Sequence, residues 1–212
     1  MSQLHGMKNR CIPGDFCGTQ LARGMLISSM GVISAASRHA TAQGAQVPYR
    51  DKQRMVALVA FTARSLETEH PRPFGASIVH TRTGKVLLSA LNNVAQACDP
   101  SAHAEVRAIR LATKRLKKTS LSGYTLYSTC EPCPMCMSTA LWARLDRVVF
   151  GATIEDANCH CNQIQISAKE VAARSDMTCV VEGPFLRDEC YALFTHPHML
   201  RAFRLWSTRK RK

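Results

Sequence analysis

From Tyr49 onward, the hydrophobic positions follow a regular pattern that predicts alternating helices and strands. Residues 75–80 and 85–91 are strand-like, and Gly84 between them is a turn glycine, so we expect a β-hairpin that begins a sheet. Residues 50–67 should form an amphipathic helix before it, because apolar side chains recur there at helical spacing: Met55, Val56, Val59, Ala60 and Ala63.

The rest of the chain continues this alternation. The helices are indicated by apolar periodicity. Two of them have a further signal near their start: Pro134 in one, and the capping-box spacing of Ser167 and Glu170 in the other. The pattern favours a three-layer α/β domain with a five-stranded mixed sheet, antiparallel at one edge and covered by helices on both faces. We expect helices at 104–116, 134–145, 168–173 and 186–206, the last interrupted at Pro197, and strands at 124–128, 147–150 (ended by Gly151) and 179–181.

Residues 1–48 lack this pattern and are interpreted as an extension of a domain that spans 49–212. The apolar stretch 24–36 is too short to cross a bilayer, so no membrane partner is expected. It has the length of a signal-peptide core, with Arg23 before it and a small-residue cleavage site at 40–42. Residues 1–42 are therefore an export signal in one interpretation. In the alternative interpretation these residues are a disordered leader, or they are included only because the start codon was assigned too early. The protein is then cytoplasmic.

The cysteine content and the charge distribution bear on the compartment of the protein and on its partners. The chain has 212 residues, a net charge of +13 and ten cysteines. The cysteines have no framework spacing of the kind seen in small secreted proteins, which favours a reducing compartment. Residues 196–212 hold six basic and no acidic residues, with Phe203 and Trp206 among them. Such a tail is usually solvated, but stacking and phosphate contact would also let it hold tRNA.

Two short segments, 99–105 and 130–136, hold the residues with recognisable chemistry. His103, Cys133 and Cys136 are suitable zinc ligands, and three protein ligands leave the fourth tetrahedral position open for water. Zinc lowers the pKa of its water to about 7, and Glu105 stands close enough to move the proton. The pattern therefore predicts a hydrolytic zinc centre. The alternative is a structural zinc with Cys130 as its fourth ligand.

Both segments lie where a strand end runs into a helix start. Open α/β sheets present reactive groups at this position. The two helix N-termini would place partial positive charge beside Cys133 and Cys136, which favours the thiolate forms that bind metal.

The motif His103-Ala104-Glu105, followed by 132–136 (Pro-Cys-Pro-Met-Cys), resembles the zinc-dependent cytidine deaminase superfamily. Residues 73–76, 92–94, 99–106 and 129–136 are similar to its guanine deaminase and nucleoside deaminase branch. The resemblance implies a cytidine-deaminase-like fold, a Zn²⁺ cofactor and a homodimer. It also implies residue roles: zinc on His103, Cys133 and Cys136, proton transfer by Glu105, and substrate binding by Asn92, Phe74, Ala104 and Pro132.

Two functions follow from the resemblance. The first is hydrolytic deamination of a purine base or nucleoside, guanine or guanosine in type, with release of ammonia. The alternative is a tRNA adenosine-to-inosine deaminase that acts on a flipped-out base, since 147–152 and 188–193 look similar to the bacterial tRNA enzymes. Cys130, where those enzymes usually have leucine, favours the first. A zinc-bearing binding module without catalysis would leave Glu105 without a role.

The segment 157–165 departs from both branches. It reads Ala-Asn-Cys-His-Cys-Asn-Gln-Ile-Gln, whereas in guanine deaminases this region helps to define the base pocket. Cys159-His160-Cys161 could form a second metal site, but three adjacent residues cannot all face one ion without a distorted backbone. We expect this segment to contribute to the pocket wall or to be an exposed loop.

Overall fold

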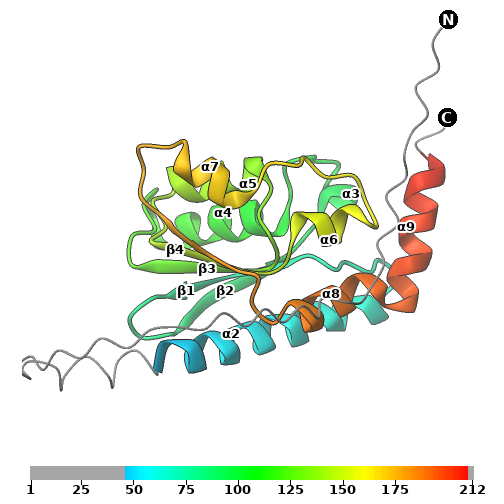
Figure 1. Cartoon of the computed structure of the whole chain (residues 1–212), viewed down its shortest axis with the longest axis horizontal. Helices are drawn as coiled ribbons and strands as arrows, with labels where there is room; N and C mark the ends of the chain where they lie inside the picture. The colour runs from blue at the N-terminus through cyan, green and yellow to red at the C-terminus, as the bar shows by residue number, and fades with distance from the viewer. Residues whose placement is uncertain (1–45, 210–212) are drawn as a thin grey trace, which may run out of the picture. The chain divides into compact units, whose positions relative to one another are not determined.

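The computed structural model describes the backbone of residues 46–209 and the side chains of residues 50–205 (Figure 1). Predictions about the leader, including the stretch 24–36 and the proposed cleavage site, lie outside the described residues. So do those about the side chain of Trp206 and about residues 210–212. None of the described helices is long and apolar enough to span a membrane.

A five-stranded mixed sheet forms the middle layer, as predicted. Its order is β2-β1-β3-β4-β5, with β1 antiparallel to both of its neighbours and β3, β4 and β5 parallel to one another. Gly84 makes the turn of the β1–β2 hairpin with a φ of +68°, a value that glycine adopts without strain. The strands are β1 (Gly75–His80), β2 (Val86–Leu91), β3 (Tyr124–Cys130), β4 (Arg147–Ala152) and β5 (Val180–Glu182).

Helices cover both faces of the sheet (Figure 1). One face carries α4 (Ala104–Leu116) and α5 (Pro134–Trp142), with α7 (Ala168–Ala173) packed on α5. The other face carries α2 (Gln46–Ala63) and α8 (Arg187–Thr195). This arrangement is the three-layer architecture expected from the hydrophobic pattern.

Neighbouring residues of the three central strands β1, β3 and β4 enter different cores, because successive side chains point to opposite faces. Ile78, Leu126 and Val148 are buried beneath α4 and α5. Their neighbours in sequence are buried on the opposite face, against Met55 and Leu58 of α2 and Phe194 of α8: Val79, Tyr127 and Val149. The sheet is therefore the shared wall of two hydrophobic cores.

Four further elements complete the described fold. The 3₁₀ turn η1 (Arg64–Glu67) continues α2, and α9 (Pro197–Arg209) begins at the proline where an interruption was predicted. The short helices α3 (Val94–Ala97) and α6 (Ile154–Asn158) were not predicted. Thr153 and Asp156 form a capping box at the start of α6, a local signal that spans too few residues to produce helical periodicity.

Several predicted boundaries are wrong, among them the end of β3, which runs to Cys130 rather than Ser128. β4 does not end at Gly151 but runs through it to Ala152. A Cβ at Gly151 would lie 2.1 Å from the Cys190 sulfur, so the glycine lets α8 approach the strand closely. Helix α5 ends at Trp142 rather than at Leu145, and Arg144, with a φ of +55°, turns the chain into β4.

A buried ion pair ties α2 to the sheet. Asp51 is 5% exposed and receives two hydrogen bonds from the Arg147 guanidinium, at 2.9 and 2.7 Å, and one from the Tyr127 hydroxyl. Arg147 also pairs with Glu182 of β5. Although burial alone would raise the pKa of Asp51, these hydrogen bonds hold it below its ordinary value. The carboxylate is thus charged and linked to three strands at neutral pH.

Replacing Arg147 by methionine should lower the free energy of unfolding by about 3 kcal/mol, because Asp51 is left buried without its cationic partner. Urea denaturation followed by circular dichroism measures the change. Arg174→Met is the matched control, since Arg174 pairs with Glu170 on the surface at 2.8 Å and its side chain is 78% exposed. Its effect should stay below about 1 kcal/mol. Equal losses in both variants would contradict the proposed importance of the buried pair.

Candidate metal centre and active site

The predicted metal ligands stand at the starts of two helices. His103 is the N-cap of α4, and Cys133 is the N-cap of α5, with Pro134 at its first position. Cys136 follows in the first turn of α5. Since α5 follows the carboxyl end of β3 directly, the ligands occupy the sheet edge where α/β folds place their reactive groups.

The three ligand atoms form a compact triangle. His103 Nδ1 lies 3.7 Å from the Cys133 sulfur and 3.5 Å from the Cys136 sulfur, and the two sulfurs are 3.6 Å apart. Ligands 2.0 to 2.3 Å from a tetrahedral zinc lie roughly 3.5 to 3.8 Å from one another. The donor set and its spacing therefore fit zinc, with a fourth position available for another ligand.

Cys130 does not join this triangle among the described residues. Its sulfur donates to the Thr153 carbonyl oxygen at 3.7 Å, and the metal-ligand cluster consists of His103, Cys133 and Cys136. Burial raises the pKa of the Cys130 thiol well above its ordinary value. The alternative of a four-ligand structural zinc through Cys130 thus lacks its fourth donor.

One sulfur of the triangle is a thiolate at neutral pH. The hydrogen bond with Cys136, followed by that with His103, lowers the pKa of Cys133 to about 4. The same contact with Cys133, together with burial, raises the pKa of Cys136 well above its ordinary value. Binding of a metal ion would release the proton that the pair still holds.

Glu105 lies in the first turn of α4 and is 6% exposed. The Ser128 hydroxyl of β3 donates to its carboxylate at 3.3 Å and holds it at the base of a cavity that His103 also lines. Burial raises the pKa of Glu105 above its ordinary value. The carboxyl group is therefore beside the metal ligands but outside their triangle, where a proton carrier is needed.

The cavity beside the triangle has a volume of about 410 Å³, within the range of small-molecule sites. It brings together three of the four predicted substrate-binding residues: Phe74, Asn92 and Ala104. Pro132 does not line it, although both of its neighbours do. The remaining lining residues are His103, Glu105, Cys133, Val94, Ala95, Cys130, Glu131, Cys161, Asn162 and Gln163.

Within residues 50–205, Asn92 presents an unpartnered hydrogen-bond acceptor in the cavity lining. Its backbone N–H donates to the Phe74 carbonyl oxygen at 3.0 Å, which fixes the residue at the cavity wall. Its side-chain Oδ1 is buried and has no hydrogen-bond partner among the described residues. A buried acceptor without a partner costs about 1 to 3 kcal/mol, which a ligand N–H would recover.

The segment that matched neither deaminase branch forms one wall of the cavity, through Cys161, Asn162 and Gln163. This confirms its expected contribution to the pocket. Cys159-His160-Cys161 is not among the clusters of metal-ligating groups in the described part of the chain. Cys130 and Phe203 of α9 belong to one hydrophobic cluster, against which Cys161 packs, and the His160 ring stacks on the Phe203 ring with their centroids 5.5 Å apart.

Glu131 was not singled out from the sequence, yet it holds this wall in place. It is 8% exposed, and its carboxylate accepts from the N–H of Ile154 at 3.3 Å and of Ala168 at 2.9 Å. These are the first residues of α6 and α7, which flank the wall segment on either side. One signal was present in the sequence, a charged residue between Cys130 and Pro132: a charge that becomes buried needs hydrogen-bond partners, but the sequence does not say which residues they are.

Comparison with known proteins places this site in a family. The model of the cytidine and deoxycytidylate deaminase zinc-binding region matches residues 49–152. Guanine deaminase of Bacillus subtilis is 47% identical over 85 residues, which cover 40% of this chain and 53% of that protein. The tRNA-specific adenosine deaminase of Aquifex aeolicus is 42% identical over 80 residues, covering 38% and 52%. The chain thus spans about half the length of these two curated relatives.

One relative is covered more fully. The probable cytosine deaminase of Schizosaccharomyces pombe is 32% identical over 127 residues, which cover 57% of this chain and 76% of that protein. Among solved structures, guanine deaminase from Nitrosomonas europaea shares the fold, with a TM-score of 0.60 and 22% identity over 71% of this chain and 82% of that one. A structure from a study of A-to-I editing by tRNA:A34 deaminases has a TM-score of 0.57 and 25% identity, covering 67% and 99%. The chain belongs to the cytidine and deoxycytidylate deaminase zinc-binding family.

Proposed function

We propose that this protein is a zinc-dependent aminohydrolase that converts an amino-purine base or nucleoside, guanine or guanosine in type, to its oxo product and ammonia. One observation carries the proposal: two members of the zinc-sized triangle of His103, Cys133 and Cys136, namely His103 and Cys133, line the same cavity as the buried Glu105. Bound zinc would supply an activated water at neutral pH. The residues around it must then hold the base and move protons.

Glu105 is the proposed proton carrier. In hydrolytic deamination a water oxygen forms a bond to the ring carbon and the C–N bond to the exocyclic amine breaks. Glu105 takes a proton from the water and passes it to the adjacent ring nitrogen; in the second step it takes the proton of the newly formed hydroxyl group and gives it to the leaving amine, which leaves the oxo group on the carbon. Its burial and the hydrogen bond from Ser128 keep the carboxyl group within the cavity for both transfers.

Asn92 and Phe74 are proposed to orient the base. The unpartnered Oδ1 of Asn92 accepts from a ring or amino N–H, while its amide N–H₂ donates to an acceptor on the same edge. Phe74 packs on Phe194 at 5.2 Å and offers an apolar wall for the ring. Asn162 and Gln163 add further amide groups to the lining of the cavity, which suits a base with several polar edges.

A second function is favoured by the basic surface of α9. Arg201 and Arg204 are exposed on this helix, and Arg209 is followed by three further basic residues. With the similarity to tRNA adenosine deaminases, they support a tRNA substrate whose adenosine is flipped into the cavity. The phosphate contacts of such a complex would be sensitive to salt.

We also propose that the protein forms a homodimer. Trp142 at the end of α5 is 76% exposed, and Ile166, which lines the same surface depression, is 39% exposed. An exposed indole and an exposed isoleucine in one surface depression are typical of an interaction surface.

The Glu105→Gln variant should keep its zinc and lose ammonia release by about 10²-fold or more, because glutamine accepts hydrogen bonds but carries no proton between steps. Metal analysis and an ammonia assay measure the two properties separately. Glu155→Gln is the control, since Glu155 is exposed on α6 and should behave like the unaltered protein. Turnover by Glu105→Gln comparable to that control would rule out the proton-carrying role.

A substrate panel separates the two functions. We expect ammonia release from guanine or guanosine to exceed that from adenine, adenosine, cytosine and an anticodon-stem RNA, and to change little between 50 and 200 mM salt. A tRNA deaminase would instead act on the RNA, and its activity would fall steeply over roughly that salt range. Preference for cytosine would contradict both.

Glu131→Ala should loosen the pocket wall at both ends, because it leaves two helix-start N–H groups without their acceptor. We expect KM to rise about tenfold or more, with a smaller change in kcat and no loss of zinc, as measured by steady-state kinetics and metal analysis. Glu131→Gln should recover part of the effect, since the amide oxygen can still accept one N–H. Glu170→Ala, at an exposed position of α7, serves as the control. A parallel loss of zinc would place Glu131 in support of the metal centre instead.

A further inference from the structure

A second group of metal-ligating side chains lies where η1 meets the start of α9. Glu67 ends η1, and His196 and His198 stand on either side of Pro197, at the junction of α8 and α9. Within the described residues this is the only group besides the catalytic triangle that brings three such side chains together. None of the three lines the catalytic cavity.

The spacing of these groups is close to that of a metal site. Glu67 Oε1 lies 3.2 Å from His196 Nε2, and Glu67 Oε2 lies 3.7 Å from His198 Nδ1. All three ligand atoms lie within 4.8 Å of one another. Nitrogen and oxygen ligands about 2.0 to 2.2 Å from a tetrahedral ion are roughly 3.4 Å apart. Closing the triangle therefore takes side-chain movements of about 1 Å.

Within the described part of the chain, the three side chains have few hydrogen-bond or ion-pair partners that would compete with a cation. Glu67 has no lysine or arginine partner among the described side chains, so its carboxylate faces only the two imidazoles. His196 Nδ1 is buried and has no hydrogen-bond partner in that part of the chain. His198 Nδ1 donates to the Leu66 carbonyl oxygen at 2.8 Å, which holds the ring beside Glu67. An ion can replace that proton, or bind Nε2 while the hydrogen bond orients the ring from behind.

We propose that Glu67, His196 and His198 form a second site for a divalent transition metal of the zinc class. Two imidazoles and a carboxylate are a donor set that zinc accepts, and the absence of sulfur distinguishes this site from the Cys-containing catalytic one. The ion would join η1 to the first turn of α9. It would thereby fix the helix whose Phe203 stacks on His160, next to the cavity wall residue Cys161.

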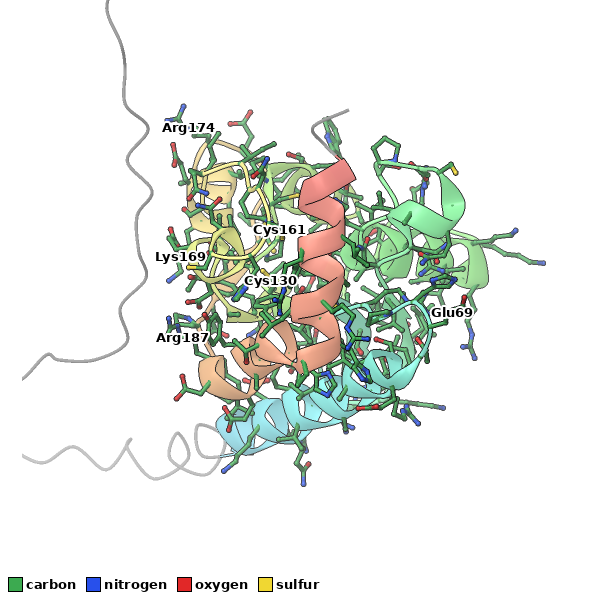
Figure 2. All side chains as sticks on the ribbon, turned by 90° about the vertical axis from the view of Figure 1, so that its right-hand side faces the viewer. Glu69, Cys130, Cys161, Lys169, Arg174 and Arg187 are labelled. Carbon is green, nitrogen blue, oxygen red and sulfur yellow. The ribbon has the colours of Figure 1, made fainter. Side chains whose placement is uncertain are left out.

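The test is the zinc content of the full chain, prepared without a metal-affinity tag, stripped with chelator, incubated with excess zinc and desalted. We expect two zinc ions per chain by mass spectrometry of the metal. His196→Ala and His198→Ala should each reduce this to one. The controls are His70→Ala and Glu69→Gln, which alter exposed side chains near Glu67 in sequence and should keep two; Glu69 is labelled in Figure 2.

Titration with cobalt identifies the ligands of each ion. The catalytic site, with two thiolates, should give a strong sulfur-to-metal charge-transfer band, whereas the second equivalent should add only weak ligand-field bands. One zinc per chain in the unaltered protein would overturn the proposal whether or not any variant folds. So would two zinc ions in both histidine variants, or growth of the sulfur band with the second equivalent. Metal content and spectra do not depend on deaminase activity, so the outcome stands apart from the proposed function.

Discussion

The convergence of two helix starts on one point is the constraint on which the site depends. His103 and Cys133 are N-caps, so each has an extended backbone and a side chain at the end of a helix. Their ligand atoms can meet only because α4, which lies over β1 and β2, packs directly against α5. The small alanine side chains that face the sheet from α4 allow this close packing: Ala104, Ala108 and Ala112. Chemistry and hydrophobic core are therefore set by the same helices.

The opposite face of the sheet supplies rigidity rather than chemistry. Asp51 of α2 is joined to β3 through Tyr127 and to β4 through Arg147, and Arg147 continues the contact to Glu182 of β5. β3 and β4, the strands that precede α5 and α6, are thus held from the face of the sheet that α2 covers. A site that must keep three ligand atoms within 3.7 Å of one another gains from a frame that does not shift when a substrate enters.

The parts of this structure that could be predicted from the sequence are those whose signal is local. The strand Gly75–His80 and the helix Ala104–Leu116 occur at the expected residues, because their apolar periodicity extends over the whole element. The metal ligands were recognisable because zinc needs those residue types at that spacing. The extent of β4 could not be predicted, because a glycine usually indicates the end of a strand. Only the structure shows that Gly151 lies within β4 and allows Cys190 of α8 to pack against it. Glu131 and the metal-ligating group at Glu67 depend on partners 23 to 132 residues away in the chain, as with His198 and Leu66, and no local pattern reports such contacts.

Because Glu131 holds both ends of the segment between α6 and α7, the sequence of this cavity wall can change independently of the metal-ligating residues. One carboxylate fixes both ends of that segment by backbone N–H groups, which every residue type except proline provides. The residues in between can therefore be exchanged during evolution, or in the laboratory, without touching a zinc ligand. A chain built in this way can change one wall of its cavity while the triangle of metal-ligating residues stays constant. The unusual sequence Cys-His-Cys-Asn-Gln at 159–163 is where such drift would be expected to leave its trace.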